Sequence, residues 1–315
     1  MRNTGDRGAR RRGAAELEEI RAYNRFVLEQ QAAISADYRE RIAAGLPVYE
    51  RPLECSFPGE VLAGYAREFK QAIRPMCIAA GADGAAPPAL VRLGSAHDGG
   101  YVMPDPGLGG IAYSLGIDSN VDWDLDMAAR GFHVFQYDGS IDALPAPHAD
   151  NPAFAFHGLF ICGRPDPRPG YRTLSQLIAE NGHGEERDMI LKMDIEGAEW
   201  DVLAALPRPD LMRFRQIVLE LHLRAEDMGR LPVFSSLLRR LASTHQAVHA
   251  HANNNGGAVR FNEEPFWYYM EVSYVRRAGL RFAPCEQHYP TPLDAPCCPE
   301  KPEISLGFFG QPERV

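Results

Sequence analysis

Between residues 111 and 275, short apolar runs alternate with segments of helical periodicity, and this alternation limits the chain to few folds. Strands are expected at 111–115, 132–137, 153–157, 189–194, 216–221, 246–251 and 267–275, with helices at 124–130, 173–180, 200–206 and 231–241. Helical crossovers predict parallel pairing, whereas the polar connection at 251–257 predicts an antiparallel last pair. We therefore expect an α/β fold with a doubly wound, mostly parallel, seven-stranded Rossmann-like sheet and an antiparallel last strand.

The length of 315 residues allows one large domain with added segments. Hydrophobic residues make up 45% of the chain, which is enough to bury a sizeable core. Helical spacing at residues 16–44 and 57–73 precedes a stretch rich in glycine, alanine and proline. We expect an N-terminal helical extension at 1–78, an α/β domain at 79–283 and a proline- and cysteine-containing tail at 284–315. The helix at 16–44 could cover the α/β domain or pair with its copy in a homo-oligomer.

The charge balance indicates which partners the chain would not bind. A formal net charge of -9 argues against a nucleic-acid partner held by phosphate contacts. The exception to this acidic balance is a local group of arginines, which we interpret as part of a solvated terminus: Arg2, Arg7, Arg10, Arg11 and Arg12. No apolar run approaches the ~20 residues that span a bilayer, and no segment resembles a signal peptide. We therefore expect no transmembrane segment and a cytoplasmic location.

Six cysteines, at positions 55, 77, 162, 285, 297 and 298, lack the spacing of a zinc site or a disulfide framework. Most of them are expected to be reduced packing residues. Cys297 and Cys298 are adjacent in a proline-rich segment, where a metal or redox role is conceivable. Incidental thiols are the preferred interpretation of this pair.

The segment at residues 113–126 ends a strand and opens a helix, as a nucleotide-like cofactor requires. Gly116 would let the backbone approach a ligand closely, and the helix N-terminus offers free N–H groups to a carboxylate. Asp118 or Asn120 could bind the amino-acid part of such a cofactor. Asp138 ends the next strand, about 20 residues further on, where an acid typically binds ribose hydroxyls.

The same spacing also fits a nicotinamide-binding domain, so the glycine pattern has to discriminate between the two. The loop has one glycine, whereas pyrophosphate binding requires G-x-G-x-x-G. Four nearby acids repel phosphate and suit a cofactor with a positive sulfonium and ammonium: Asp118, Asp122, Asp124 and Asp126. A plain strand-turn-helix with an aspartate cap is the alternative without a ligand.

Three strands that should be buried on both faces carry polar residues at every second position near their carboxyl ends. They are Lys192, Asp194 and Glu196 on the first, Glu220 and His222 on the second, and His249 and His251 on the third. If these strands are neighbours, the side chains converge on one patch at the ligand edge of the sheet, and burial without purpose would be costly. A partly solvated face or structural salt bridges would explain the pattern without chemistry.

Such a patch could remove a proton from a hydroxyl nucleophile, with His222, His249 or His251 as the general base. Asp194, Glu220 and His222, with His251 or Asn254 nearby, also form a nitrogen and oxygen set suited to a divalent metal. The candidate catalytic residues are Asp194, Glu196, His222, His251 and Lys192.

The motif LKMDIEGAEWDVL at residues 191–203 resembles the LKxDxEGxE signature of the FkbM-like methyltransferases, a branch of the class I S-adenosylmethionine-dependent enzymes. A DGGYV block contributes Asp98, Gly99, Gly100 and Tyr101, which the resemblance assigns to the cofactor pocket. A structural hairpin is an equal interpretation of that block. The stretch from residues 249–254 through residues 270–277 also matches. The tail at 291–296 resembles the end of family members, where an asparagine often follows; Cys297 stands there instead.

The resemblance implies S-adenosyl-L-methionine as cofactor, in some relatives with magnesium, and a hydroxyl of a sugar or of a glycosylated or polyketide-like small molecule as acceptor. We therefore expect an O-methyltransferase that acts on a small molecule or glycan, with metal- or histidine-assisted deprotonation; Mg or Mn is the metal considered. The alternative is a non-catalytic protein that keeps the fold and binds the cofactor. A nicotinamide oxidoreductase is third, disfavoured by the missing glycines.

Overall fold

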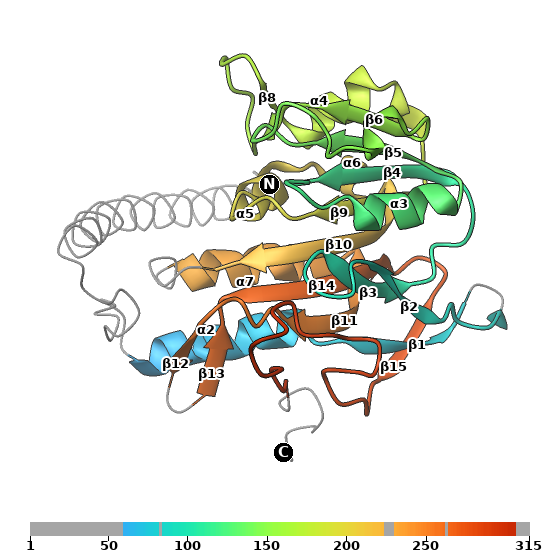
Figure 1. Ribbon diagram of the computed structural model, residues 1–315. Helices are drawn as coiled ribbons and strands as arrows, with labels where there is room; N and C mark the ends of the chain where they lie inside the picture. Colours follow the sequence, from blue (N-terminus) through green and yellow to red (C-terminus); the bar gives the residue numbers. More distant parts are fainter. Residues whose placement is uncertain (1–58, 82–83, 224–229, 262–263, 307–315) are drawn as a thin grey trace, which may run out of the picture.

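The computed structural model describes residues 59–81, 84–223, 230–261 and 264–306 (Figure 1). The helix expected at residues 16–44, the arginines of the first dozen residues and Cys55 lie outside these residues. In the part of the chain that is described, no helix is both long enough and apolar enough to cross a membrane.

A seven-stranded sheet forms the centre of the molecule, with the strand order β11–β14–β10–β9–β4–β5–β6. All its neighbouring strands pair parallel except β14, which runs antiparallel to both β10 and β11. The expected doubly wound, mostly parallel sheet is confirmed. The strands are β4 (Gly110–Leu115), β5 (Phe132–Tyr137), β6 (Phe154–His157), β9 (Met189–Met193), β10 (Phe214–His222), β11 (His245–Ala252) and β14 (Tyr269–Arg276).

Apolar side chains alternate between the two faces of the sheet, as the period of two requires. On one face, Tyr113 and Leu191 belong to a core that includes residues of α2, α4, α5 and α7. On the other face, Ala112 and Ile190 pack with Trp123 of α3. The helices, with short turns, are α2 (Gly59–Ala72), α3 (Asp122–Ala129), η2 (His148–Asp150), α4 (Leu174–Glu180), η3 (His183–Glu185), α5 (Glu199–Ala205), α6 (Arg208–Leu211) and α7 (Leu231–Ala242).

Within the described residues, four two-stranded sheets surround the central one. They pair β1 (Met76–Ala80) with β15 (Arg281–Pro284), β2 (Leu90–Gly94) with β3 (Gly100–Pro104), β7 (Phe160–Ile161) with β8 (Tyr171–Arg172), and β12 (Ala258–Phe261) with β13 (Glu264–Trp267). The hairpin interpretation of the DGGYV block is thus correct for its backbone, since the block spans the end of the turn after β2 and the start of β3. In Figure 1 this hairpin lies near α3, on the face opposite α7.

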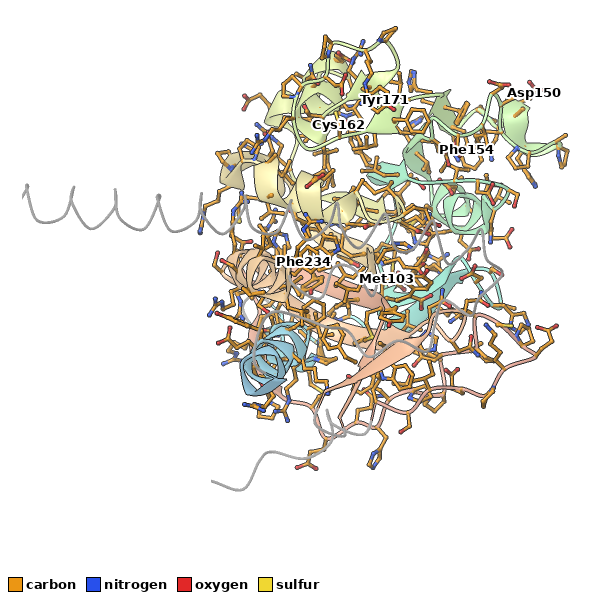
Figure 2. All side chains as sticks on the ribbon, turned by 90° about the vertical axis from the view of Figure 1, so that its left-hand side faces the viewer. Met103, Asp150, Phe154, Cys162, Tyr171 and Phe234 are labelled. Atoms are coloured by element: carbon orange, nitrogen blue, oxygen red, sulfur yellow. A yellow bond between two sulfur atoms is a disulfide. The ribbon has the colours of Figure 1, made fainter. Side chains whose placement is uncertain are left out.

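Cys77 and Cys285 form a disulfide between β1 and the residue that follows β15. This pair is an exception to the expectation that most cysteines are reduced. The two residues are 208 positions apart, so their proximity depends on the antiparallel pairing of β1 with β15. Among the described cysteines, Cys162 (Figure 2), Cys297 and Cys298 are free.

Candidate active site

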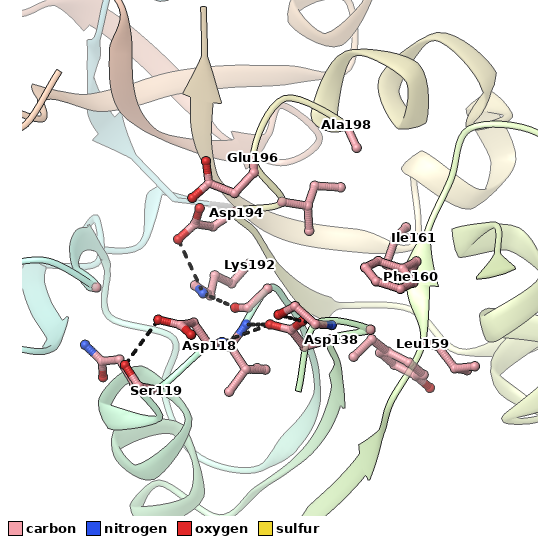
Figure 3. A pocket seen from close by; sticks show the side chains of 18 of the residues that line it. Asp118, Ser119, Asp138, Leu159, Phe160, Ile161, Lys192, Asp194, Glu196 and Ala198 are labelled. Carbon is pink, nitrogen blue, oxygen red and sulfur yellow. Dashed lines mark hydrogen bonds and ion pairs between the residues drawn. The ribbon is translucent and has the colours of Figure 1, made fainter. Parts of the chain in front are cut away.

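A cavity of about 760 Å³ opens at the carboxyl ends of β4, β5 and β9 (Figure 3). Parallel strands bring their carboxyl ends to the same edge, where loops and helix N-termini face a ligand. Nine residues expected from the sequence line it: Asp98, Gly99, Gly116, Asp118, Asn120, Asp138, Lys192, Asp194 and Glu196. Gly100, Tyr101, Glu220, His222 and His251 are not among its lining residues. Six of the eight expected cofactor residues therefore gather in one cavity, whereas Gly100, Tyr101 and part of the expected catalytic group lie outside its lining.

Gly116 joins β4 to the loop that leads into α3, in a left-handed conformation with φ of 84°. A Cβ atom at this position would lie 1.6 Å from the carbonyl oxygen of Asp194, so only glycine allows the two strand ends to approach. Lys192 Nζ donates a hydrogen bond of 2.6 Å to the carbonyl of Gly116. The lysine that the sequence suggested as catalytic thus holds the loop to β9.

Asp138, just after β5, organises the same loop from the other side. Its carboxylate accepts hydrogen bonds from the backbone N–H groups of Ile117, Asp118 and Ser140, at 2.7 to 2.8 Å, and from the Ser140 hydroxyl. Burial raises its pKa, but these hydrogen bonds outweigh burial and the pKa lies below its ordinary value. Asp138 therefore remains a carboxylate, with Ser140 as the one side-chain donor that could rotate to admit a ribose hydroxyl.

The four acids of the loop do not all face the ligand. Asp118 lines the cavity, but Asp124 is buried, and its pKa is raised to about 6 by burial, against the opposing charge of Lys192. Asp126 accepts a hydrogen bond from the backbone N–H of Gly94 and so anchors the β2–β3 hairpin on α3. The sequence interpretation of these two acids as ligand-facing is wrong. The cavity is nonetheless acidic, because its lining holds Asp98, Asp118, Asp138, Asp194 and Glu196 but a single basic residue, Lys192.

The opposite wall of the cavity is apolar and was not anticipated. Leu159, Phe160, Ile161 and Tyr171 line it, and the rings of Phe160 and Tyr171 stack with centroids 5.1 Å apart. Phe160 stays 44% exposed, although it is a large apolar side chain. The strands that carry these rings have two residues each, too short for a periodicity signal. An acidic wall facing an aromatic wall suits a ligand with a cationic end and a flat ring.

Asp194 stands at the end of β9, in the centre of the site. Tyr101 donates a hydrogen bond of 2.8 Å to Oδ2 of Asp194, and Lys192 Nζ lies 3.7 Å from the same oxygen. Burial and the negative charge of Asp194 raise the pKa of Tyr101 well above its ordinary value, so the phenol remains a donor. Tyr101 thus contacts Asp194 from outside the lining of the cavity, and Gly100 begins β3, where a Cβ atom would lie 1.9 Å from the carbonyl oxygen of Ser95.

His222, the last residue of β10, is held by an acid that the sequence interpretation omitted. Glu199 is completely buried and accepts hydrogen bonds from His222 Nδ1 at 3.0 Å and from the backbone N–H groups of Ile195 and Gly197. The other ring nitrogen, Nε2, lies 3.6 Å from Glu196 and 3.9 Å from Asp194. Burial lowers the pKa of His222, but Glu199 and the neighbouring carboxylates outweigh this, so the pKa is raised. Glu199 therefore fixes the ring with Nε2 toward Asp194.

The polar patch expected from three neighbouring strands has a different layout. β14 lies between β10 and β11, so the third strand of the patch is not adjacent to the second. Glu271 of β14 fills the gap, directly opposite Glu220 on one side and His251 on the other. The sequence of β14 shows the same alternation as the other three strands, since Glu271 and Ser273 alternate with apolar residues on a buried strand.

His249 and His251, two of the three histidines of β11, are engaged outside the lining of the cavity. His249 Nε2 lies 2.8 Å from Asp294, and His251 lies between Glu271 at 2.8 Å and Glu303 at 3.2 Å. Although burial lowers the pKa of His251, the carboxylates of Glu271, Asp294 and Glu303 raise it to about 9. Of the three histidines considered as a base, only His222 faces the residues that line the cavity.

Divalent-metal ligands are also grouped differently from the expected set. Asp194, Glu196 and His222 have ligand atoms within 4.8 Å of one another, whereas Glu220 groups with Asp98 and Glu271. His222 Nε2 lies 4.0 Å from Glu220. The expected ligands Asp194, Glu220 and His222 are therefore close together, but they do not form one of these metal-ligand groups.

Comparisons with known proteins agree with this geometry. Residues 149–255 match the family described as the methyltransferase FkbM domain, which confirms the resemblance drawn from residues 191–203. A human probable methyltransferase-like protein 24 is 32% identical over 122 residues, 35% of this chain and 32% of that protein. The AMB antimetabolite synthetase AmbE of Pseudomonas aeruginosa is 45% identical over 71 residues, 22% of this chain and 3% of that protein. The chain thus spans a third or less of these relatives.

Among solved structures, the methyltransferase FkbM of Methylobacillus flagellatus has a TM-score of 0.31 at 12% identity, covering 52% of this chain and 44% of that chain. A putative RNA methyltransferase of Pyrococcus horikoshii has a TM-score of 0.31 at 10% identity, covering 79% of this chain and 98% of that chain.

Proposed function

We propose that this chain, which carries a methyltransferase FkbM domain at residues 149–255, transfers the methyl group of S-adenosylmethionine to a hydroxyl of a sugar or of a glycosylated or polyketide-like small molecule. One observation carries the proposal. Gly116, Asp138 and Asp194 follow three adjacent parallel strands and line a single cavity. The acids suit a cofactor with a sulfonium and an ammonium group, and the substrate class rests on the family resemblance.

The cofactor would lie across the ends of β4 and β5. Asp138 would accept ribose hydroxyls after Ser140 rotates, and the stacked rings of Phe160 and Tyr171 offer an apolar surface for the adenine. Asp118 and Asn120 are near the start of α3, where free N–H groups favour the methionine carboxylate. S-adenosylmethionine supplies an activated methyl group, so the chain has to orient the acceptor and take up its proton.

His222 is the residue best arranged to take up that proton. Glu199 accepts from Nδ1–H, so that in the neutral imidazole Nε2 carries no proton, and Nε2 is directed toward Asp194 and Glu196 at the cavity. A buried carboxylate that orients an imidazole and stabilises its protonated form is the arrangement used by many general bases. Asp194 would then hold the acceptor hydroxyl near the methyl group, with Tyr101 fixing its carboxylate.

A divalent cation is the second route to the same deprotonation. Asp194, Glu196 and His222 present one nitrogen ligand and two carboxylate oxygen ligands within 4.8 Å of one another, a set that Mg or Mn accepts. A bound ion would polarise the acceptor hydroxyl directly. Chelator-treated protein that retains full transfer would leave His222 as the base. Loss of transfer that Mg²⁺ or Mn²⁺ restores would assign the step to the metal.

Methyl-labelled S-adenosylmethionine and a panel of sugars and glycosides test the function itself. We expect label on an acceptor oxygen, and loss of transfer in Asp194→Ala with little change in affinity for S-adenosylhomocysteine. Asp201→Asn is the control. Asp201 lies on α5, which follows the loop that carries Asp194, but its side chain is 73% exposed and does not line the cavity. Unchanged transfer in Asp194→Ala would contradict the assignment. A chain that binds the cofactor but labels no acceptor would favour the non-catalytic alternative.

A further inference from the structure

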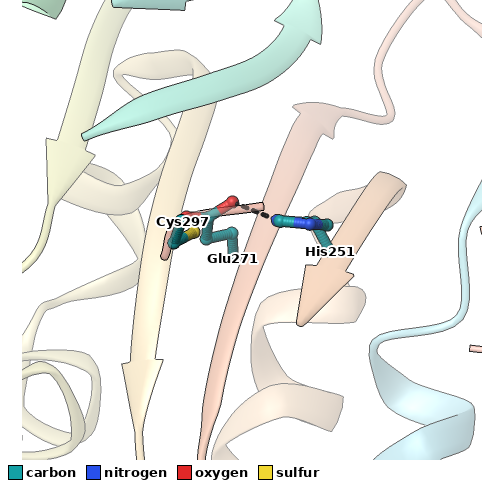
Figure 4. Close-up of side chains that lie close together, drawn as sticks. All are labelled: His251, Glu271 and Cys297. Atoms are coloured by element: carbon teal, nitrogen blue, oxygen red, sulfur yellow. Dashed lines mark hydrogen bonds and ion pairs between the residues drawn. The ribbon is translucent and has the colours of Figure 1, made fainter. Parts of the chain in front are cut away.

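A second cluster of ligand-type side chains lies beside the cavity but outside its lining. It combines His251 of β11, Glu271 of β14 and Cys297 of the C-terminal tail (Figure 4). All three are buried, with exposed fractions of 1%, 5% and 4%. An imidazole, a carboxylate and a thiol are three different ligand types, and buried side chains of this kind seldom meet without a structural or chemical reason.

The ligand atoms are close enough to share one ion. His251 Nδ1 lies 2.8 Å from Glu271 Oε2, and Cys297 Sγ lies 3.2 Å from Glu271 Oε1 (Figure 4). Zn²⁺ binds imidazole nitrogen and carboxylate oxygen at about 2.0 to 2.2 Å and thiolate sulfur at about 2.3 Å, in tetrahedral geometry. Ligand atoms in such a site are roughly 3.3 to 3.7 Å apart, so the three side chains would separate by roughly half an ångström to admit the ion.

The outer partners of the cluster match those of a metal-bound histidine. Nε2 of His251, the nitrogen that faces away from Glu271, lies 3.2 Å from Glu303 Oε1. Metal-ligating histidines usually donate their second ring N–H to a carboxylate, which fixes the tautomer and strengthens the ligand. Glu303 therefore leaves Nδ1 as the nitrogen available to an ion.

The tail that carries Cys297 is fastened on both sides of it. His249 contacts Asp294 at 2.8 Å, three residues before Cys297. Asn254 accepts a hydrogen bond from the backbone N–H of Cys298 and donates to the carbonyl of the same residue. The segment that carries the thiol is thus positioned by contacts that do not depend on the cluster, which is the preorganisation that a metal site needs.

The charges around the cluster also favour a cation. Glu271 lies directly opposite Glu220 in the antiparallel β10–β14 pair, and like charges in that position destabilise a sheet. Oxygens of Asp98, Glu220 and Glu271 lie within 4.8 Å of one another, with Asn253 Nδ2 donating to both Asp98 and Glu220. The Asp98 carboxylate, which belongs to this group of oxygens, could supply the fourth ligand.

We propose that His251, Glu271 and Cys297 form a zinc site that ties the C-terminal tail to the edge of the central sheet. Nδ1 of His251, an oxygen of Glu271 and the Cys297 thiolate are the ligands, with Asp98 or water in the fourth position and Glu303 holding the histidine. On binding, the thiol and Nδ1 release their protons to solvent, and no electron is transferred. Thiolate and imidazole together favour Zn²⁺ over the hard cations Mg²⁺ and Ca²⁺.

Cobalt(II) substitution in the chelator-treated full chain tests the site, because a cobalt–thiolate bond gives a charge-transfer absorption that carboxylate and imidazole ligands do not. We expect this band at one equivalent of cobalt, its loss in Cys297→Ser and its retention in Cys298→Ser. Cys298 is the matched control, since its thiol contacts Glu300 rather than the cluster. A wild-type chain without the band, or a band that persists in Cys297→Ser, would overturn the proposal.

Glu303→Gln provides a second test of the zinc site, because it leaves all the proposed ligands unchanged. It tests the proposal even if Cys297→Ser fails to fold. Loss of a carboxylate behind a metal-bound histidine lowers metal affinity by about 10- to 100-fold. We expect a decrease of this size in competition with a chromogenic zinc chelator. Unchanged zinc affinity in Glu303→Gln would contradict the site. Failure of the methyltransferase proposal would leave both measurements unaffected, because neither uses the cofactor or an acceptor.

Discussion

The buried carboxylate of Glu199 accepts a hydrogen bond of 3.0 Å from Nδ1 of His222, and with its other contacts it joins the loop after β9 to the end of β10. The conformation of the loop and the orientation of the imidazole therefore both depend on the Glu199 side chain. This connection places His222 Nε2 next to Asp194, where an acceptor hydroxyl would lose its proton.

Glu199→Gln should lower the turnover number by at least about tenfold while changing the KM for S-adenosylmethionine little, because the imidazole loses its orienting charge. The amide cannot accept from all three N–H donors, so a stability loss of about 1 to 3 kcal/mol is also expected. Initial rates and urea unfolding separate the two effects. Asp201→Asn on the same helix should change neither. Full turnover in Glu199→Gln would show that His222 needs no such partner.

Gly116→Ala should abolish binding of S-adenosylhomocysteine, because its Cβ would collide with the Asp194 carbonyl and push β4 and β9 apart at the cavity. Gly182→Ala is a matched control. Gly182 also has positive φ, at 75°, but a Cβ there meets nothing within 4 Å, so only the conformational cost of about 1 kcal/mol applies. Calorimetric titration of both variants checks the expectation. Equal affinity in the two variants would mean that the close approach at Gly116 does not shape the site.

His245 should make the fold acid-sensitive between pH 6.5 and about 4. It is buried, its Nε2 faces the carbonyl of Phe214, and burial lowers its pKa from 6.5 to about 4, with Arg276 adding to the effect. Over this range the unfolded chain binds a proton that the native state excludes, so stability falls as pH falls, by up to about 3 kcal/mol.

Urea unfolding as a function of pH measures this loss. The part due to His245 should disappear in His245→Gln and persist in His133→Gln, whose side chain is exposed on β5. An identical pH dependence in the wild-type chain and His245→Gln would refute the role of His245.

Removing the Cys77–Cys285 disulfide should lower the free energy of unfolding by about 2 to 5 kcal/mol, because the bond closes a long loop in the unfolded chain. The Cys77→Ser/Cys285→Ser double variant and urea unfolding measure the loss, and peptide mapping without reduction identifies the bond. Cys162→Ser, at a free cysteine, is the control and should change stability by less than about 1 kcal/mol. Two free thiols at positions 77 and 285 in the purified chain would disprove the pairing.

The sequence predicted the sheet well because its signals are local. The alternation around Leu191 and the glycine at 116 each depend on neighbouring residues in the chain, and both the strand and the loop are where they were expected. The acid at 138 was likewise found at the cavity, since its spacing from Gly116 follows from one strand–helix–strand unit.

The missed features depend on contacts between distant segments. Glu199 acts through His222, 23 residues away, and Glu271 matters because β14 enters the sheet between β10 and β11. Cys77 meets Cys285 across 208 residues. Asp124 and Asp126 were misassigned for a related reason, since their helix turns two of the loop's four acids toward the protein interior and the β2–β3 hairpin.

Calorimetric titration of the full chain with S-adenosylhomocysteine and, separately, with NAD tests the central claim most directly. The acidic cavity, with a single glycine at the strand end, predicts binding of S-adenosylhomocysteine at least about 100-fold tighter than that of NAD, and loss of that binding in Gly116→Ala. Preference for NAD, or no binding of S-adenosylhomocysteine by the folded wild-type chain, would contradict it.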